Sequence, residues 1–149
     1  MPVAQSAAQA AHHPEARSYD ATRDASADVD AALAQATQSG KHVLLVMGAN
    51  WCHDSRALAG WLETPRFAEL VAREYELVFV NVGMPQTGDG HNLDIARRFG
   101  LDELPGTPNL LVVAPDGSLA NADSATSWRN AASRSEDEIF EELVSLAAN

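Results

Sequence analysis

The stretch KHVLLVMGANWCHDS, residues 41–55, joins a short apolar run to the only cysteine of the chain. The run from Val43 to Met47 shows no alternation of apolar and polar residues, which is typical of a strand covered on both faces. Residues from Asn50 onward follow a helical pattern, so Cys52 is predicted at the start of a helix. Loops at the carboxyl edge of an open parallel sheet form ligand sites, and this edge is where the pattern predicts Cys52.

Helices and strands alternate on either side of this stretch. Two further apolar runs, ELVFVNV at 76–82 and NLLVVA at 109–114, are predicted to be buried strands. Helical patterns lie before, between and after the strands, and the last one opens with the capping box SEDE at 135–138. The turn PDGS after the third run predicts a hairpin with a short strand near Leu119. This order implies a parallel pair with right-handed crossovers and an antiparallel edge.

The first part of the chain differs in composition from the rest. Residues 1–25 are rich in Ala and Gln and are expected to form a disordered or extended tail, followed by one domain over residues 26–149. The tail lacks the basic and strongly apolar regions of a secretion signal. The pair His12 and His13 offers metal ligands, but a solvated tail is the favoured interpretation, so we predict no metal site and no cofactor.

Charge and cysteine content exclude several classes of partner. With 10 basic and 21 acidic residues the net charge is −11, which argues against nucleic acid or an anionic membrane as a partner. No apolar run approaches the ~18 residues of a membrane span. A single cysteine excludes an intrachain disulfide and any Cys-rich metal site. Composition does not bear on the oligomeric state.

Two motifs adjoin the predicted strands. WCHDS at 51–55 follows the first apolar run, and GTPNLLVV at 106–113 places Thr107-Pro108 directly before the third apolar run. Together with the order of strands and helices they resemble the thioredoxin superfamily, over nearly all of residues 28–148. The resemblance is strongest to small bacterial thioredoxin-like proteins, many of which are exported. Together with the Ala-rich tail at residues 1–25, this resemblance favours a periplasmic location. It implies an α/β, thioredoxin-like three-layer sandwich, a central mixed sheet with helices on both faces, and a cis-proline at Pro108.

The departures from the family pattern concern the same site. Ser55 stands where thioredoxins have their second, resolving cysteine, and Val46 stands where they carry a buried acid. A serine cannot attack a disulfide, so a mixed disulfide at Cys52 must be resolved by an outside thiol. The sequence therefore predicts a monothiol CxxS motif.

Cys52 and Ser55 are the candidate catalytic residues. A helix N-terminus stabilises a thiolate at Cys52, whereas the alternative is a buried, inert cysteine. Ser55 lies one helical turn further on, where its hydroxyl either donates to the thiolate or simply caps the helix. A protonated His53 would favour the thiolate and Asp54 would oppose it. The alternative is that they are solvated residues of the first turn, which is the favoured interpretation for Asp54 and fits His53 as well as the first one does.

The resemblance adds the residues that would bind substrate. It implies that Thr107 and Pro108 lie beside the cysteine and offer backbone groups to an extended substrate, with Trp51 and His53 shaping the site. The loop at 84–91 is expected either to overhang the site, with Met84, Pro85 and His91 as walls, or to be a plain surface loop. Arg129 or Arg134 would hold an anionic partner such as glutathione, unless both are merely solvated.

Two functions follow from these residues. The first is thiol–disulfide exchange through Cys52 by mixed disulfides, of isomerase or deglutathionylation type, with protein thiols and disulfides or glutathione as partners. The alternative is a non-catalytic binding module that recognises an extended protein segment in the cis-proline groove. A monothiol glutaredoxin is a more distant third, because no glutathione-binding motif follows CHDS.

Overall fold

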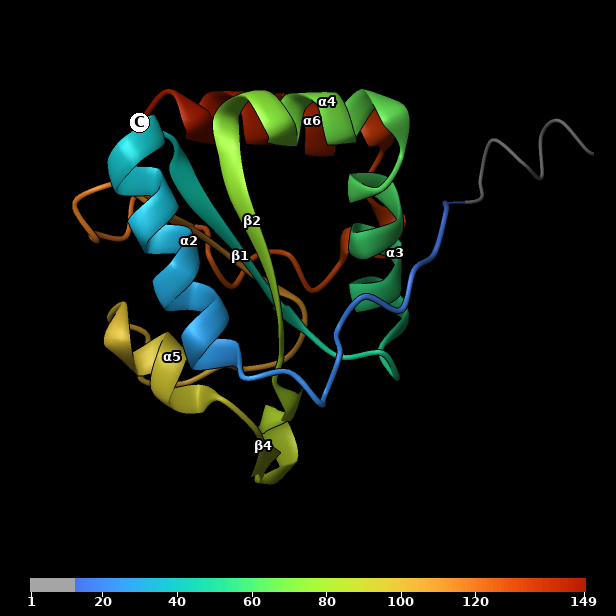
Figure 1. The fold of residues 1–149 in the computed structure, drawn as a ribbon. Helices are drawn as coiled ribbons and strands as arrows, with labels where there is room; N and C mark the ends of the chain where they lie inside the picture. Colours follow the sequence, from blue (N-terminus) through green and yellow to red (C-terminus); the bar gives the residue numbers. More distant parts are fainter. Residues whose placement is uncertain (1–12) are drawn as a thin grey trace, which may run out of the picture.

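Three strands form the central sheet in the computed structural model, which describes residues 13–149 (Figure 1). β1 (His42–Gly48) lies in the middle, between β2 (Tyr75–Asn81) and β5 (Asn109–Val113). β2 runs parallel to β1, and β5 runs antiparallel to it. The mixed sheet, with its parallel pair and antiparallel edge, is confirmed.

Five α-helices belong to the described part of the chain: α2 (Ala25–Ser39), α3 (His53–Leu62), α4 (Pro65–Glu74), α5 (Leu93–Arg98) and α6 (Glu136–Ala147). Figure 1 shows α4 and α6 side by side across one end of the sheet, α3 beside them, and α2 and α5 together on the other side. Within residues 13–149, no helix is long and apolar enough to cross a membrane.

β1 is buried on both faces, and its alternating side chains divide the core in two. Leu44 and Val46 pack with α3, α4 and α6, while Val43, Leu45 and Met47 pack with α2 and α5. A strand with apolar side chains on both faces needs a helical layer on each. The continuous apolar run therefore explains the three-layer α/β sandwich, and the predicted fold class is confirmed.

The capping signals in the sequence mark where the last helix begins. The Ser135 side chain accepts a hydrogen bond from Glu138 N, and the Glu138 carboxylate accepts one from Ser135 N, both at 3.1 Å. These bonds satisfy two N–H groups near the start of α6. The helix then buries Ile139, Leu143 and Leu146 against the sheet.

The expected hairpin after β5 is reduced to a single bridge between Val113 and Leu119. The Asn121 side chain replaces the second strand: its Oδ1 accepts from Val112 N and its Nδ2 donates to the Leu110 carbonyl, both at 2.8 Å. One side-chain amide thus satisfies the backbone groups that a neighbouring strand would otherwise pair with. The predicted hairpin is therefore present in a shortened form: Ala114 N donates to the Ser118 carbonyl at 2.8 Å and Ala120 N to the Val112 carbonyl at 2.7 Å, and the pairing ends there.

Residues 13–24, called the N-terminal strap below, run extended across α3 toward the start of α2 (Figure 1). Tyr19 of the strap is 1% exposed and belongs to the core under α3 and α4. Asn50 holds it in place, since its side chain accepts from Tyr19 N at 3.0 Å and donates to the Tyr19 carbonyl at 3.1 Å. No sequence pattern indicated this packing. Residues 1–12, and His12 within them, lie outside the described residues.

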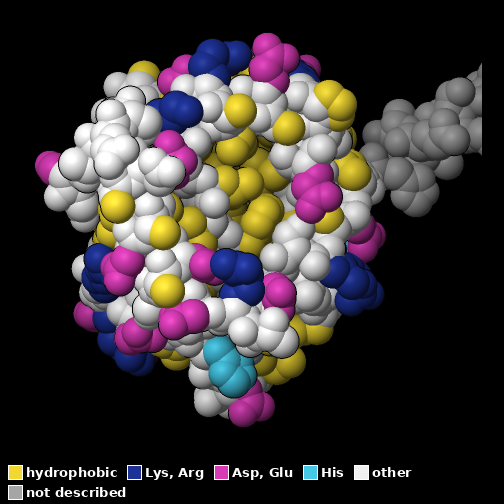
Figure 2. Space-filling view, in the orientation of Figure 1, with side chains coloured by type: hydrophobic (Ala, Val, Ile, Leu, Met, Phe, Trp, Pro, Cys, Tyr) yellow, Lys and Arg dark blue, Asp and Glu magenta, His cyan; other side chains and the backbone are white. Residues whose placement is uncertain are grey.

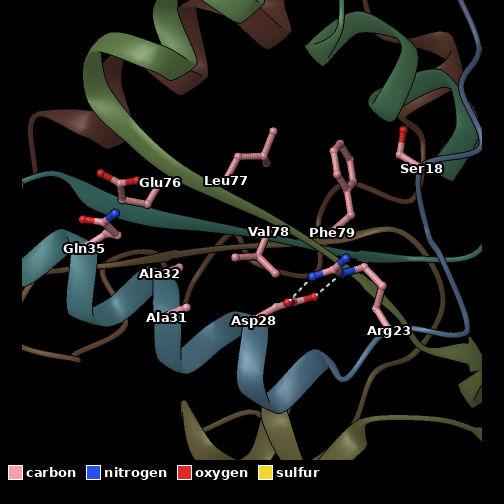
Figure 3. A pocket seen from close by; sticks show the side chains of 10 residues that line it. All are labelled: Ser18, Arg23, Asp28, Ala31, Ala32, Gln35, Glu76, Leu77, Val78 and Phe79. Atoms are coloured by element: carbon pink, nitrogen blue, oxygen red, sulfur yellow. Dashed lines mark hydrogen bonds and ion pairs between the residues drawn. The ribbon is translucent and has the colours of Figure 1, made fainter.

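β2 is an edge strand, and its free side borders a hollow of about 400 Å³. Figure 2 shows apolar side chains gathered in a hollow in the middle of this face. Figure 3 shows the side chains of Leu77 and Phe79 on one side of β2 and that of Val78 on the other. The ion pair between Arg23 and Asp28, with 2.6 Å between nitrogen and oxygen, also lines the hollow. The walls come from the strap, α2 and β2, and none of the predicted site residues belongs to them.

Candidate functional site at the start of α3

Cys52 is the residue immediately before α3, with extended backbone (φ −90°, ψ 123°). Its carbonyl accepts from Arg56 N at 2.9 Å and so begins the helix, while its side chain makes no capping hydrogen bond. The N–H groups of the first helical turn carry partial positive charge and are available to an anion. Cys52 is 8% exposed, so the thiol lies at the positive end of α3 with narrow access to solvent.

The cis-proline segment lies against this thiol. The Thr107–Pro108 peptide bond is cis, and Cys52 Sγ donates to the Thr107 carbonyl at 3.6 Å. Both Thr107 and Pro108 are buried. Asn109 braces the turn, since its side chain donates to the Gly106 carbonyl at 2.8 Å. The structure thus brings together the two predicted motifs, which are distant in sequence.

Ser55 fulfils neither of the two roles considered for it. The residue is fully buried, and its Oγ has no hydrogen-bond partner among the described residues, neither the Cys52 sulfur nor a helix N–H group. β1 ends directly beneath it: a Cβ placed on Gly48 would lie 2.6 Å from Ser55 Oγ and 2.8 Å from the Tyr19 ring. Glycine at residue 48 therefore leaves the space that the serine and the tyrosine occupy.

Trp51 is the exposed wall of the site. The residue is 47% exposed, and its indole Nε1 donates to the Gly83 carbonyl at 3.0 Å. Gly83 belongs to a small hairpin of β3 (Gly83–Met84) and β4 (Asp89–Gly90), joined by the 3-10 turn η1 (Pro85–Thr87). The hairpin that contains the predicted loop is therefore tied to Trp51 through the backbone of Gly83, the residue just before that loop.

Pro85 faces a second hollow, beside the cis-proline segment. This hollow measures about 470 Å³ and lies between the β3–β4 hairpin, α5 and the segment 102–105. Pro105, the last residue of this segment, lines the hollow and stands two residues before Thr107 in the chain. Met84 and His91, the other expected walls, do not line it.

His53 faces the strap. Its side chain is 58% exposed, and its Nε2 lies 3.4 Å from the Glu15 carboxylate. The same carboxylate pairs with Arg56 at 2.8 Å. Because the hydrogen bond from Arg56 lowers the pKa of Glu15, with further contributions from the charges of Arg56, His53 and His13, the carboxylate is ionised at neutral pH. The strap thus presents a fixed negative charge beside the residue that follows Cys52.

The loop after β5 covers the other side of α3. Asp54 accepts from Ala132 N at 2.8 Å, next to the 3-10 turn η2 (Ala131–Ser133), so it is a structural acceptor and not a solvated residue. Arg134 is engaged with Glu142 and lies over the Trp128 ring at 4.1 Å. Arg129 is exposed, and a Cβ on Gly106 would lie 2.6 Å from its Cδ. Of the two arginines considered, Arg129 is the one beside the cis-proline segment.

Tyr19 is the functional-site neighbour that the sequence did not indicate. Its hydroxyl donates to the Ser55 carbonyl at 2.8 Å, within the first turns of α3. Burial raises the pKa of Tyr19, and the negative charge of a Cys52 thiolate raises it further. The only signal in the sequence is a lone aromatic residue in the otherwise polar stretch PEARSYD.

Residues 24–115 match a family model described as thioredoxin-like. The match covers more than half of the chain, and it includes both Cys52 and the cis-proline segment. The chain therefore belongs to the thioredoxin-like family.

One solved structure shows the same fold, and a second is similar to a lesser degree. A disulphide isomerase from Xylella fastidiosa Temecula1 is 33% identical, with a TM-score of 0.77, over 86% of this chain and 95% of that one. The C-terminal domain of DsbD from Neisseria meningitidis, in its reduced form, is 23% identical with a TM-score of 0.48, over 73% and 96% of the two chains. No curated protein matches the chain.

Proposed function

We propose that this protein exchanges thiols and disulfides through Cys52, as a monothiol protein of isomerase or deglutathionylation type. The observation that supports the proposal most strongly is the contact between the Cys52 thiol and the Thr107 carbonyl, 3.6 Å apart at the start of α3. The likeness to a disulphide isomerase over 86% of the chain supports it independently.

The exchange has two steps, and neither needs a metal. The Cys52 thiol loses its proton to solvent, and the thiolate attacks one sulfur of a disulfide. A new S–S bond forms at Cys52 while the old one breaks, and the leaving sulfur departs as a thiolate that takes up a proton. A second thiolate then attacks the mixed disulfide and releases Cys52.

The source of the second thiol defines the type of reaction. In isomerisation it is a thiol of the substrate, so no net oxidation or reduction occurs. In deglutathionylation it is a second glutathione molecule, which leaves with the first as oxidised glutathione. Cys52 is the single cysteine of the sequence, and Ser55 carries a hydroxyl where a resolving thiol would be, so the second thiol must come from another molecule.

The Thr107 carbonyl would take part in both states of the cycle. In the free protein it accepts from the Cys52 thiol. A mixed disulfide has no proton on sulfur, so the carbonyl would then be free to accept an N–H group from an extended substrate. This is strand-type recognition, in which backbone hydrogen bonds give affinity. Trp51 and His53 are exposed at the rim, where they would contact side chains of that substrate.

Arg129 gives the site a cation beside the cis-proline turn. Its guanidinium forms no ion pair with the described residues, unlike that of Arg134. It is therefore available to a carboxylate of glutathione or of a substrate protein. Arg129→Gln should then slow removal of glutathione from a peptide more than it slows isomerisation of a disulfide without a nearby acid.

A second candidate function is recognition without chemistry. The observation that favours it is the state of the thiol: Cys52 is 8% exposed and donates to a backbone carbonyl. Such a site would bind an extended protein segment in the same groove and leave the sulfur unreacted. Activity assays separate the two functions directly.

The test uses two substrates, ribonuclease A with scrambled disulfides and a glutathionylated peptide, each in a glutathione buffer. The wild-type protein should accelerate at least one reaction above the buffer alone, and Cys52→Ser should abolish the acceleration while keeping the wild-type circular dichroism spectrum. Ser55→Cys supplies the missing resolving thiol and should shorten the lifetime of the mixed disulfide at Cys52. No acceleration by the wild-type protein, with tight binding of the unfolded substrate, would establish the binding function instead.

A further inference from the structure

The strap brings two metal-ligating side chains against the first residue of α3. The ligand atoms of His13, Glu15 and His53 all lie within 4.8 Å of one another. The imidazole rings of His13 and His53 are 4.7 Å apart between centroids. Two histidines and one carboxylate are the protein ligands of several catalytic zinc sites.

Neighbouring groups orient two of these ligands. Nδ1 of His13 lies 3.1 Å from the Pro14 carbonyl, which can only accept, so this contact engages Nδ1 as a donor and leaves Nε2 as the ring nitrogen that would bind an ion. Arg56 donates to Oε1 of Glu15 at 2.8 Å, which leaves Oε2 facing His53. Partners of this kind set the tautomer and the direction of ligands in metal sites.

The spacing between the nearest two ligand atoms fits a tetrahedral ion. Two bonds of about 2.0–2.2 Å at a tetrahedral angle place their ligand atoms about 3.3–3.6 Å apart. His53 Nε2 and Glu15 Oε2 are 3.4 Å apart. The side chains of Glu15 and His53 are 43% and 58% exposed, so they can rotate to close the longer separations without disturbing the core.

We propose that His13, Glu15 and His53 bind a divalent transition-metal ion, with zinc as the representative. Imidazole ligands favour this class of ion over magnesium or calcium. The net charge of −11 attracts cations to the protein. Arg56 opposes binding by its charge, but its hydrogen bond occupies the carboxylate oxygen that faces away from His53. A bound ion would clip the strap to α3, beside Cys52.

The test is isothermal titration of the full chain with zinc chloride after treatment with a chelator. The Cys52→Ser background removes the thiol as a competing ligand. One ion should bind per chain, and Glu15→Gln and His53→Gln should each weaken binding by about tenfold or more. His91→Gln is the matched control, because His91 is an exposed histidine outside the cluster, and it should bind zinc as the parent does.

Three results would overturn the proposal. The first is no saturable binding. The second is unchanged affinity in both Glu15→Gln and His53→Gln, which would place the ion on histidines of the N-terminal segment alone. The third is binding by the wild-type chain that is lost in Cys52→Ser, which would make the thiol the ligand. Zinc affinity in the Cys52→Ser background is independent of disulfide exchange, so failure of this proposal leaves the proposed function untouched.

Discussion

Gly60→Ala tests the packing of the N-terminal strap, because two effects on the free energy of unfolding have opposite signs. Alanine within a helix is more favourable than glycine by about 1 kcal/mol. A Cβ at residue 60, however, would lie 2.4 Å from the carbonyl carbon of Pro14 and 2.5 Å from its oxygen. These are backbone atoms that cannot rotate away, so the strap must move off α3.

The loss can be worked out from the contacts of the strap. Ala16 N donates to the Arg56 carbonyl at 3.0 Å, and this bond, next to the clash, contributes about 1 kcal/mol. If the displacement reaches Tyr19, its two hydrogen bonds with Asn50 and part of its buried area are lost as well, about 3 kcal/mol more. After subtraction of the gain in helix propensity, Gly60→Ala should leave the free energy of unfolding unchanged if only the Ala16 bond is lost, and should lower it by about 3 kcal/mol if the displacement reaches Tyr19.

The assay is urea unfolding of Gly60→Ala, Tyr19→Ala and the double variant. In the Tyr19→Ala background the strap has already lost its anchor, so Gly60→Ala should be neutral there or stabilising by up to about 1 kcal/mol. Stabilisation of the otherwise wild-type chain by about 1 kcal/mol would refute the reasoning, because it would mean that the strap does not cross α3 at residue 60.

Three further predictions concern buried polar groups. Asn121→Ala should cost about 2–4 kcal/mol in urea unfolding, because it leaves the β5 groups of Leu110 and Val112 unpaired; a loss below ~1 kcal/mol would contradict this. Burial raises the pKa of Tyr19 in the folded chain above its value of about 10 in the unfolded chain. The contribution of the Tyr19 hydroxyl to the free energy of unfolding is therefore complete below about pH 10 and falls as the pH rises further. Tyr19→Phe should therefore flatten the decline of Tm above about pH 10, and an unchanged decline would refute it. Ser55→Ala removes a buried hydroxyl without a partner, so its unfolding free energy should stay within ~1 kcal/mol of wild type; a larger loss would reveal a partner.

The sequence predicted the fold well because the sheet depends on local pattern. Residues 43–47 form an unbroken apolar run, which in a chain of this size requires cover on both faces. The alternation of strands and helices then leaves few arrangements of the sheet. The capping box at Ser135 similarly depends on four consecutive residues, and its two hydrogen bonds are both present.

The parts that could not be predicted depend on contacts between distant segments. Tyr19 is buried at a point where the Asn50 side chain binds the backbone of the strap and the tyrosine hydroxyl donates to the Ser55 carbonyl. The hairpin after β5 is shortened because the Asn121 side chain takes the place of a strand. The approach of His13 to His53 requires the strap to cross α3, which no local pattern reveals.

The most direct measurement for the central claim is the rate at which Cys52 forms a mixed disulfide with oxidised glutathione. The rate should be followed by intact mass spectrometry at mildly acidic pH, for the folded chain and for the same chain unfolded in urea. The account predicts faster reaction in the folded chain, because the start of α3 stabilises the attacking thiolate. Slower reaction in the folded chain than in the unfolded one would contradict the account and would make Cys52 a buried, inert residue.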